Sequence, residues 1–209
     1  MSTSNNRILK LYRSRITIIE QLESLNYDVS NYDDFSINEI DAMEQNKQLD
    51  ILVNHKQTNR KLYVRYYLKN SQYLKKDIYE YIDELYEIKN TLSNEDTFVI
   101  ITDDEPNAII QTTIRYLFDH SKKYIVLHNI NRLQFNILNH SLVPKANVLN
   151  DEQVKELKQK YSIETQKQLP EISRFDPHAL AIYLRPGEIC EFKRNSATAM
   201  NYNYYRVCV

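Results

Sequence analysis

Glycine is nearly absent from this sequence, since Gly187 is the only one among 209 residues. A globular chain of this length carries about fifteen glycines, because average usage is roughly 7%. Phosphate-binding loops and nucleophile elbows each need several glycines to make their tight turns. The sequence therefore excludes the nucleotide-binding and hydrolytic enzymes that depend on such loops.

Cysteines and long apolar runs are also scarce. The two cysteines, Cys190 and Cys208, are too few for a disulfide framework or a zinc cluster. No apolar run approaches the roughly 20 residues that span a bilayer. Residues 1–15 lack the apolar core of a signal peptide. We therefore expect a soluble, non-secreted protein that has no membrane partner.

Neither sign of charge is in excess, because 27 Lys and Arg residues stand against 28 Asp and Glu residues. The formal net charge of −1 gives no overall basic footprint for nucleic acid, so any contact with DNA would have to be local. A hydrophobic content of 42% and a charged content of 26% are typical of a globular protein.

Helical and strand patterns alternate in the N-terminal two thirds of the chain. Apolar spacings of three and four predict helices over residues 6–25 and 71–90, with Asn6 and Ser71 as their N-caps. The second helix is expected to bury one face, made of Leu74, Ile78, Tyr81, Ile82, Leu85 and Ile88. Strands are predicted over residues 49–55, 61–68, 97–102 and 124–129, and a short helix within residues 26–48.

The last two of these strands should be parallel, because a helix separates them in the sequence. Pro106 follows three carboxylates and is expected at the first position of that helix. Asp103, Asp104 and Glu105 suit a helix N-terminus better than a metal site, because three adjacent residues do not converge on one ion.

The composition changes near residues 138–143, where we expect a domain boundary. A capping box of Asn150 and Gln153 predicts a helix over residues 150–161, and two strands follow over residues 188–193 and 203–209. Arg185-Pro186-Gly187-Glu188 has Pro at the second and Gly at the third position, which predicts a type II turn with a positive φ at Gly187. The terminal strand should be paired in a sheet or against a partner.

A nuclease is one hypothesis for the N-terminal sheet. Restriction-nuclease-like cores bind Mg²⁺ with an Asp at the end of one strand and an acid-x-Lys on the next. Asp50 could be the first ligand, but Val64-Arg65-Tyr66 offers no carboxylate for the second. Arg65 and its flanking tyrosines could stack on bases, but a strand face covered by the following helix is favoured.

A disulfide between the two cysteines is a second open question. A hairpin centred near Thr198 or Ala199 would place Cys190 and Cys208 almost opposite each other, within bonding reach. In a reducing compartment the bond is disfavoured, and two small buried hydrophobic residues are then expected.

The last third of the sequence carries six short elements in a fixed order. They are His140 with Leu142-Val143-Pro144-Lys145, Leu169-Pro170-x-Ile172, Asp176-Pro177-x-Ala179, Arg185-x-Gly187-Glu188, Arg194-x-Ser196-x-Thr198, and Tyr205-Arg206. This series resembles the assembly domain of the fifth-largest subunit shared by the eukaryotic nuclear RNA polymerases. It equally resembles the corresponding small subunit of archaeal polymerases, which is that domain alone. The N-terminal part resembles the eukaryotic subunit's jaw domain in its layout and in the stretch EPNAI.

The hairpin loop departs from the family pattern. Ala197 stands where the family has Glu, and Ala199 and Met200 stand where it has a small residue and Gly. Any contact that this Glu makes is therefore lost here.

The resemblance implies an α/β N-terminal jaw domain, with a nuclease-like sheet and helices, over residues 1–139. It also implies a small α+β assembly domain, with a mixed sheet and a C-terminal hairpin, over residues 140–209. Their expected function is that of a non-catalytic structural subunit of a multisubunit DNA-directed RNA polymerase. The subunit would dock on the largest polymerase subunit and line the downstream DNA cleft during transcription.

The resemblance also implies partners and site residues. The partners are the largest and other polymerase subunits, and downstream duplex DNA within the complex. Pro106 and Asn107 carry over as the DNA-proximal residues. No catalytic residue, metal or cofactor is implied for this chain, because the catalytic Mg²⁺ belongs to the largest subunit.

Two other functions stay open: a degenerate nuclease-fold protein, and an adaptor that binds polymerase from outside. The abundance of residues with AT-rich codons, together with the loop departures, slightly favours a large DNA virus as the source. The expected location is then the virion and the host cytoplasm, whereas a cellular eukaryotic protein would be in the nucleus.

Overall fold

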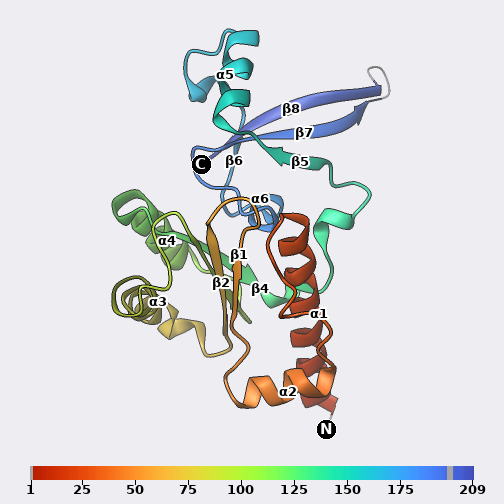
Figure 1. Cartoon of the computed structure of the whole chain (residues 1–209), viewed down its shortest axis with the longest axis vertical. Coiled ribbons are helices and arrows are strands. Elements are labelled where there is room, and N and C mark those ends of the chain that lie inside the picture. The colour runs from red at the N-terminus through yellow and green to blue at the C-terminus, as the bar shows by residue number, and fades with distance from the viewer. Residues whose placement is uncertain (1, 197–199) are drawn as a thin grey trace. The chain divides into compact units, whose positions relative to one another are not determined.

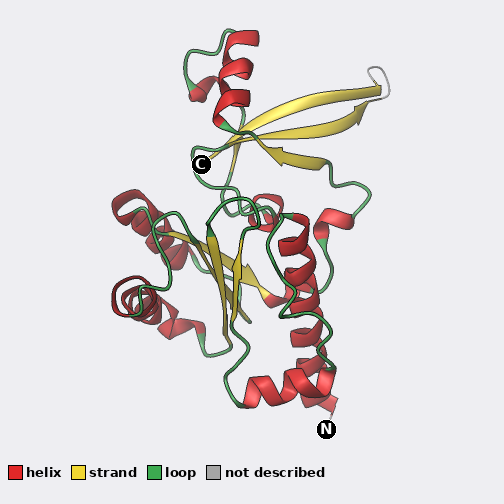
Figure 2. Ribbon diagram, in the orientation of Figure 1, coloured by secondary structure: helices red, strands yellow, loops and turns green. Residues whose placement is uncertain are grey.

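The computed structural model describes residues 2–196 and 200–209. The chain divides into two compact units, Met1–Asn136 and Ile137–Val209. The boundary predicted from the sequence, after residue 139, lies close to this division. Both units combine helices with a mixed β-sheet (Figures 1 and 2). No helix among the described residues is long and apolar enough to cross a bilayer.

A four-stranded sheet forms the centre of the N-terminal unit. Its strands follow the order β1 (Ile51–Asn54), β2 (Lys61–Tyr67), β3 (Thr97–Thr102) and β4 (Tyr124–Asn129). The first pair is antiparallel, and the two later pairs are parallel. Every residue of β3 and β4 is buried, as expected of strands covered on both faces. The predicted strands and the parallel crossover are therefore confirmed.

Helices cover both faces of this sheet, with α1 on one side and α3 and α4 on the other (Figure 1). They are α1 (Ser2–Ser24), α2 (Ile37–Gln45), the 3₁₀ turn η1 (Ser71–Tyr73), α3 (Leu74–Ile82), the π-helix η2 (Asp83–Ile88), α4 (Ala108–Ser121) and the 3₁₀ turn η3 (Ile130–Leu133). α1 begins before Asn6, so the predicted N-cap at Asn6 is wrong. The short helix α2 was predicted, and a capping box of Ser36 and Glu39 starts it.

The helix predicted over residues 71–90 differs from the structure at both ends. Asn70 caps the first turn, by accepting a hydrogen bond from the backbone N–H of Gln72, so the predicted cap at Ser71 is wrong. At the other end α3 continues as η2, in which the N–H of Lys89 bonds to the carbonyl of Glu84. This wider turn rotates the later side chains. Ile88, expected inside, is 76% exposed.

Helix α4 begins two residues later than the sequence suggested. The side chain of Asn107 accepts a hydrogen bond from the N–H of Ile110 at 2.9 Å, so Asn107 is the N-cap and Ala108 the first helical residue. Pro106 precedes the cap, and its predicted place at the first helical position is wrong.

Arg65 of β2 lies within a network of polar and aromatic side chains. Its Nε is 3.2 Å from Asp50 Oδ2, and its Nη1 is 3.0 Å from Glu84 Oε2. The guanidinium carbon lies 4.5 Å from the ring centre of Tyr81 on α3, and the Tyr63 hydroxyl donates to Asp50 at 2.6 Å. Burial, followed by this hydrogen bond, raises the pKa of Tyr63 to about 12. The prediction of a strand face covered by the following helix is confirmed.

We predict that Glu84→Gln lowers the free energy of unfolding of the N-terminal unit more at pH 7 than at pH 3. Hydrogen bonds from Lys89 and then Arg65 lower the pKa of Glu84 below its ordinary 4.5. A lowered pKa adds stability that is present above pH 4.5 and is lost as the pH falls through the folded-state pKa. Urea unfolding at the two pH values measures the difference.

Glu80→Gln is the matched control for this prediction. Glu80 pairs with Lys76 one turn away, and both side chains are well exposed. Such surface pairs contribute little to stability, so this change should leave the pH dependence of unfolding as it is in the parent chain. If Glu84→Gln loses as much stability at pH 3 as at pH 7, the pKa of Glu84 is not lowered by its hydrogen bonds with Lys89 and Arg65.

The C-terminal unit contains a second four-stranded sheet, of order β5-β7-β8-β6. Its elements are the 3₁₀ turn η4 (Ile137–Asn139), β5 (Lys145–Val148), α5 (Asp151–Lys160), the 3₁₀ turn η5 (Gln166–Gln168), β6 (Glu171–Ile172), α6 (Pro177–Ala181), β7 (Ile189–Ser196) and β8 (Met200–Cys208). β8 pairs antiparallel with β7 and parallel with β6. The predicted mixed sheet with a C-terminal hairpin is confirmed, and the terminal strand lies inside the sheet. The capping box of Asn150 and Gln153 on α5 is also confirmed.

The register of the hairpin separates the two cysteines. The strands pair Ser196 with Met200, so Cys190 is opposite Arg206, and Cys208 lies two residues further along β8. The cysteines are therefore offset from each other and not directly opposite. Both are free and buried in one apolar cluster, in which Phe192 is a neighbour. Burial raises the pKa of each thiol to about 12. The two cysteines are small apolar core residues, as predicted for the case in which no disulfide forms.

Candidate functional site

The turn that contains the only glycine starts the C-terminal hairpin. Gly187 has a φ of 88°, as the predicted type II turn requires. The N–H of Glu188 donates to the carbonyl of Arg185 at 3.0 Å, and the N–H of Arg185 donates to the Glu188 carboxylate at 2.9 Å. The N–H of Gly187 donates to the carbonyl of Cys208. The turn therefore fixes the end of β8, and the Glu188 carboxylate holds the backbone of the turn by accepting the hydrogen bond from Arg185.

The two faces of the C-terminal sheet carry different side chains, because neighbours along a strand point to opposite faces. The face toward α6 includes Cys190 and Phe192, which pack with Ala179 of that helix. The opposite face includes Ile189 and Val207, which form a cluster with Leu157 of α5 and with Leu169. Residues of the six sequence elements lie on both faces.

A small hollow on the α6 side collects four of the predicted residues. We call it the arginine hollow; its lining is Pro144, Ile172, Asp176, His178, Phe192, Arg194 and Arg206, and its volume is about 160 Å³. The predicted members come from four different sequence elements and meet only in the folded chain. A more open hollow of about 900 Å³ shares Pro144 and Arg194 and adds His140, Lys145 and Lys193.

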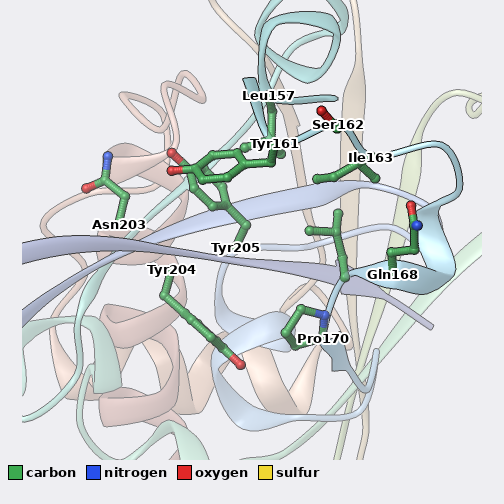
Figure 3. Close-up of a pocket in the computed structure, with 10 residues that line it drawn as sticks. Leu157, Tyr161, Ser162, Ile163, Gln168, Pro170, Asn203, Tyr204 and Tyr205 are labelled. Atoms are coloured by element: carbon green, nitrogen blue, oxygen red, sulfur yellow. The ribbon is translucent and has the colours of Figure 1, made fainter. Parts of the chain in front are cut away.

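A second hollow, on the α5 side, is lined mainly by aromatic and aliphatic side chains. Its volume is about 380 Å³, and the predicted residues Pro170 and Tyr205 belong to it. Figure 3 shows the rings of Tyr161 and Tyr205 side by side, while Tyr204 points to the other side of β8. The Tyr205 hydroxyl donates to Glu191 at 2.9 Å, which fixes that ring.

The remaining predicted residues have local backbone roles or lie at the surface. Asp176 is the N-cap of α6, where it accepts from the N–H of His178, and Pro177 follows at the first helical position. His140 is exposed, and its Nδ1 accepts from the N–H of Leu142. Ser196 ends β7, and Thr198 lies outside the described residues, with Ala197 and Ala199.

Sequence reasoning did not select His178, Phe192 and Tyr204 as members of this site. Strand alternation from Arg194 points to Phe192, two residues earlier on β7, and hairpin pairing then points to Tyr204 opposite it. His178 had no such signal, because a short helix brings it to the sheet.

The predicted DNA-proximal residues lie in a loop that the sheet holds in place. The Thr102 hydroxyl donates to the carbonyl of Asp104 at 2.8 Å, and the Asn129 side chain donates to the carbonyl of Asp103 at 3.2 Å. Arg132 binds both oxygens of Glu105 at 3.1 Å. In the part of the chain that the structure describes, no three His, Cys, Asp or Glu side chains form a metal-binding group.

Comparisons with known proteins point to one family. The family model "RNA polymerase Rpb5, C-terminal domain" matches residues 135–208. DNA-directed RNA polymerase subunit Rpo5 of Pyrococcus horikoshii is 49% identical over 76 residues, which are 36% of this chain and 92% of that subunit. Rpo5 of Methanococcoides burtonii is 33% identical over 76 residues, covering 36% of this chain and 96% of that subunit.

A eukaryotic relative matches a slightly longer stretch. Subunit RPABC1 of the DNA-directed RNA polymerases I, II and III of Caenorhabditis briggsae is 37% identical over 92 residues, which are 44% of this chain and 43% of that subunit. The chain therefore belongs to the Rpb5 family of RNA polymerase subunits.

Proposed function

We propose that the chain is a non-catalytic structural subunit of a multisubunit DNA-directed RNA polymerase. The observation that carries this proposal is the match to archaeal subunit Rpo5, which covers 92% of that subunit at 49% identity. The matching family model lies on residues 135–208, which nearly coincide with the C-terminal unit. A relative made almost entirely of this unit indicates that the unit suffices for assembly into a polymerase.

The C-terminal unit would be the assembly domain that docks on the largest subunit. Support comes from Pro144, Asp176, Arg194 and Arg206, which belong to four of its sequence elements and line a surface hollow. Arg194 is exposed, and Arg206 and Pro144 are half-buried, so a partner can reach them. The N-terminal unit would be the jaw domain, with its nuclease-like sheet beside downstream DNA.

Purification of the tagged full-length chain from its source tests the proposal. The two largest polymerase subunits should come with it in fixed stoichiometry through gel filtration. An adaptor that binds from outside would be present in less than equal amounts and would be lost on dilution. Recovery of the chain without polymerase subunits would refute the proposed function. Recovery in virions would support the viral source, which stays a prediction.

We predict that position 104 crosslinks to DNA ahead of the transcription bubble in the assembled polymerase. Asp104 is exposed in the loop that precedes Pro106 and Asn107. A photo-crosslinking residue at 104 spares Asn107, whose loss as N-cap would cost about 1 kcal/mol. Crosslink mapping on a stalled elongation complex reads the position. A probe at the exposed Ile88 of the same unit is the control, and should crosslink less.

The free chain should show no measurable affinity for duplex DNA at physiological salt. Asp103 and Asp104 repel phosphate in this loop, Glu105 is already paired with Arg132, and the chain's net charge is −1. A helix N-terminus offsets only about 0.3–1 kcal/mol of such repulsion. Tight binding by the free chain, or crosslinks only to upstream DNA, would refute the placement of the N-terminal unit.

A further inference from the structure

Two guanidinium groups lie on the same tyrosine ring in the C-terminal unit. The guanidinium carbons of Arg194 and Arg206 are 4.9 Å and 5.2 Å from the ring centre of Tyr204. Arg194 is on β7 and Arg206 is on β8, so the strand pairing holds both in place. Both arginines line the arginine hollow, and the tyrosine ring attracts their charges without neutralising them.

A carboxylate paired with them is absent from the chain's own described residues. Within residues 2–196 and 200–209, no carboxylate is within ion-pair distance of Arg194 or Arg206. The Nε of Arg206 is buried and has no hydrogen-bond partner among these residues. A buried donor without a partner is costly, and native proteins rarely leave one. The two arginines therefore have donors to offer to another molecule.

The net charge of the side chains that line the arginine hollow suits a bound anion with one negative charge. Asp176 lines the hollow, and its Oδ1 already accepts from the N–H of His178. The His178 ring packs edge-on against Phe192 at 5.1 Å, and burial lowers the pKa of His178, so the imidazole is neutral at pH 7. Two guanidinium groups and one carboxylate leave one positive charge for an incoming anion to neutralise.

The shape of the hollow favours a carboxylate side chain over nucleic acid. Its volume is about 160 Å³, and Pro144, Ile172 and Phe192 give it apolar walls. These walls suit the methylene groups of Asp or Glu, and a planar guanidinium matches the two oxygens of a carboxylate. A nucleic-acid strand, by contrast, needs a basic groove that continues on both sides.

We propose that the arginine hollow is a carboxylate-binding pocket. It receives an Asp or Glu side chain from the polymerase subunit on which the C-terminal unit docks, with Arg194 and Arg206 as the donors. This inference rests on the proposed function. It adds the chemistry of the partner surface, which should present an acidic side chain at this point.

Exchange of the subunit out of the assembled polymerase tests the pocket. Tagged full-length variants are assembled with the other subunits and challenged with excess untagged chain. Arg194→Gln and Arg206→Gln should each speed the exchange by about tenfold or more, because loss of one partner of a hydrogen-bonded charge pair mainly raises the dissociation rate. Arg194→Lys keeps the charge without the planar fork and should fall between these variants and the parent chain.

Lys155→Gln is the matched control. Lys155 is an exposed cation of the same unit, on α5, and it lines neither the arginine hollow nor the larger hollow beside it, so its exchange should stay within about twofold of the parent rate. Thermal unfolding of the isolated variants excludes a folding defect. Arg206 is half-buried, so its loss can destabilise the fold. The Arg194→Gln variant should have the same melting temperature as the parent chain, because Arg194 is exposed. This variant therefore decides the test.

The outcomes separate the pocket from the proposed function. If the parent chain does not assemble with polymerase, the proposed function fails and the pocket loses its occupant. If the parent assembles and Arg194→Gln exchanges at the parent rate, the function stands and the carboxylate pocket is wrong. The arginine effects should also persist after DNase and RNase digestion. Their disappearance would assign the hollow to a nucleic-acid phosphate and overturn the proposal.

Discussion

Gly187→Val should lower the free energy of unfolding of the C-terminal unit by about 2 kcal/mol or more. The φ of Gly187 is 88°, a region that costs an ordinary side chain about 1–3 kcal/mol and a β-branched one more. The hydrogen bonds of Gly187 and Glu188 to β8 keep the turn from relaxing. Urea unfolding, with hydrogen exchange to locate the change in residues 137–209, measures the loss.

Steric clash is not the cause of the predicted loss, because a Cβ at Gly187 would have no atom within 4 Å. Gly187→Asn is therefore the matched control, since Asn tolerates positive φ and occurs at this turn position. It should retain most of the stability that Val loses. Equal losses for Asn and Val would contradict the explanation by backbone conformation.

The features predicted well from the sequence are those that local chemistry determines. Pro followed by Gly at the two central positions of a turn favours a type II turn, with a positive φ at the glycine, as Gly187 has. The capping box of Asn150 and Gln153 starts a helix through its own side chains. The apolar runs over β3 and β4 are short enough for strands and lack polar alternation, which indicates strands buried on both faces, and every residue of both is buried.

The candidate site was predictable only in part, because it depends on contacts between distant segments. Pro144, Asp176, Arg194 and Arg206 come together through the strand order β5-β7-β8-β6, which no local pattern encodes. The exact cross-strand partner of Cys190 was not predictable for a similar reason. A shift of the hairpin centre by one residue changes every cross-strand partner, so Cys190 is opposite Arg206.

The end of α3 shows a further limit of periodicity. A regular helix of 3.6 residues per turn would have put Ile88 on the same face as Leu85 and Ile78. The π-helix η2 adds a residue to the turn, so Leu85 and Tyr86 are buried and Ile88 faces solvent. The spacing of apolar residues in the sequence does not distinguish one wide turn from a regular helix.

Leu85→Ala should therefore destabilise the N-terminal unit by about 2–5 kcal/mol, whereas Ile88→Ala should change its stability by less than about 0.5 kcal/mol. Leu85 is 2% exposed and Ile88 is 76% exposed, although only three positions separate them. Truncation of Leu85 removes buried surface and leaves a cavity; truncation of Ile88 removes atoms that already face water. Urea unfolding of both variants, with hydrogen exchange over residues 74–92, compares the two. Similar losses at both positions would mean that α3 continues as a regular α-helix, and the π-helix would then be wrong.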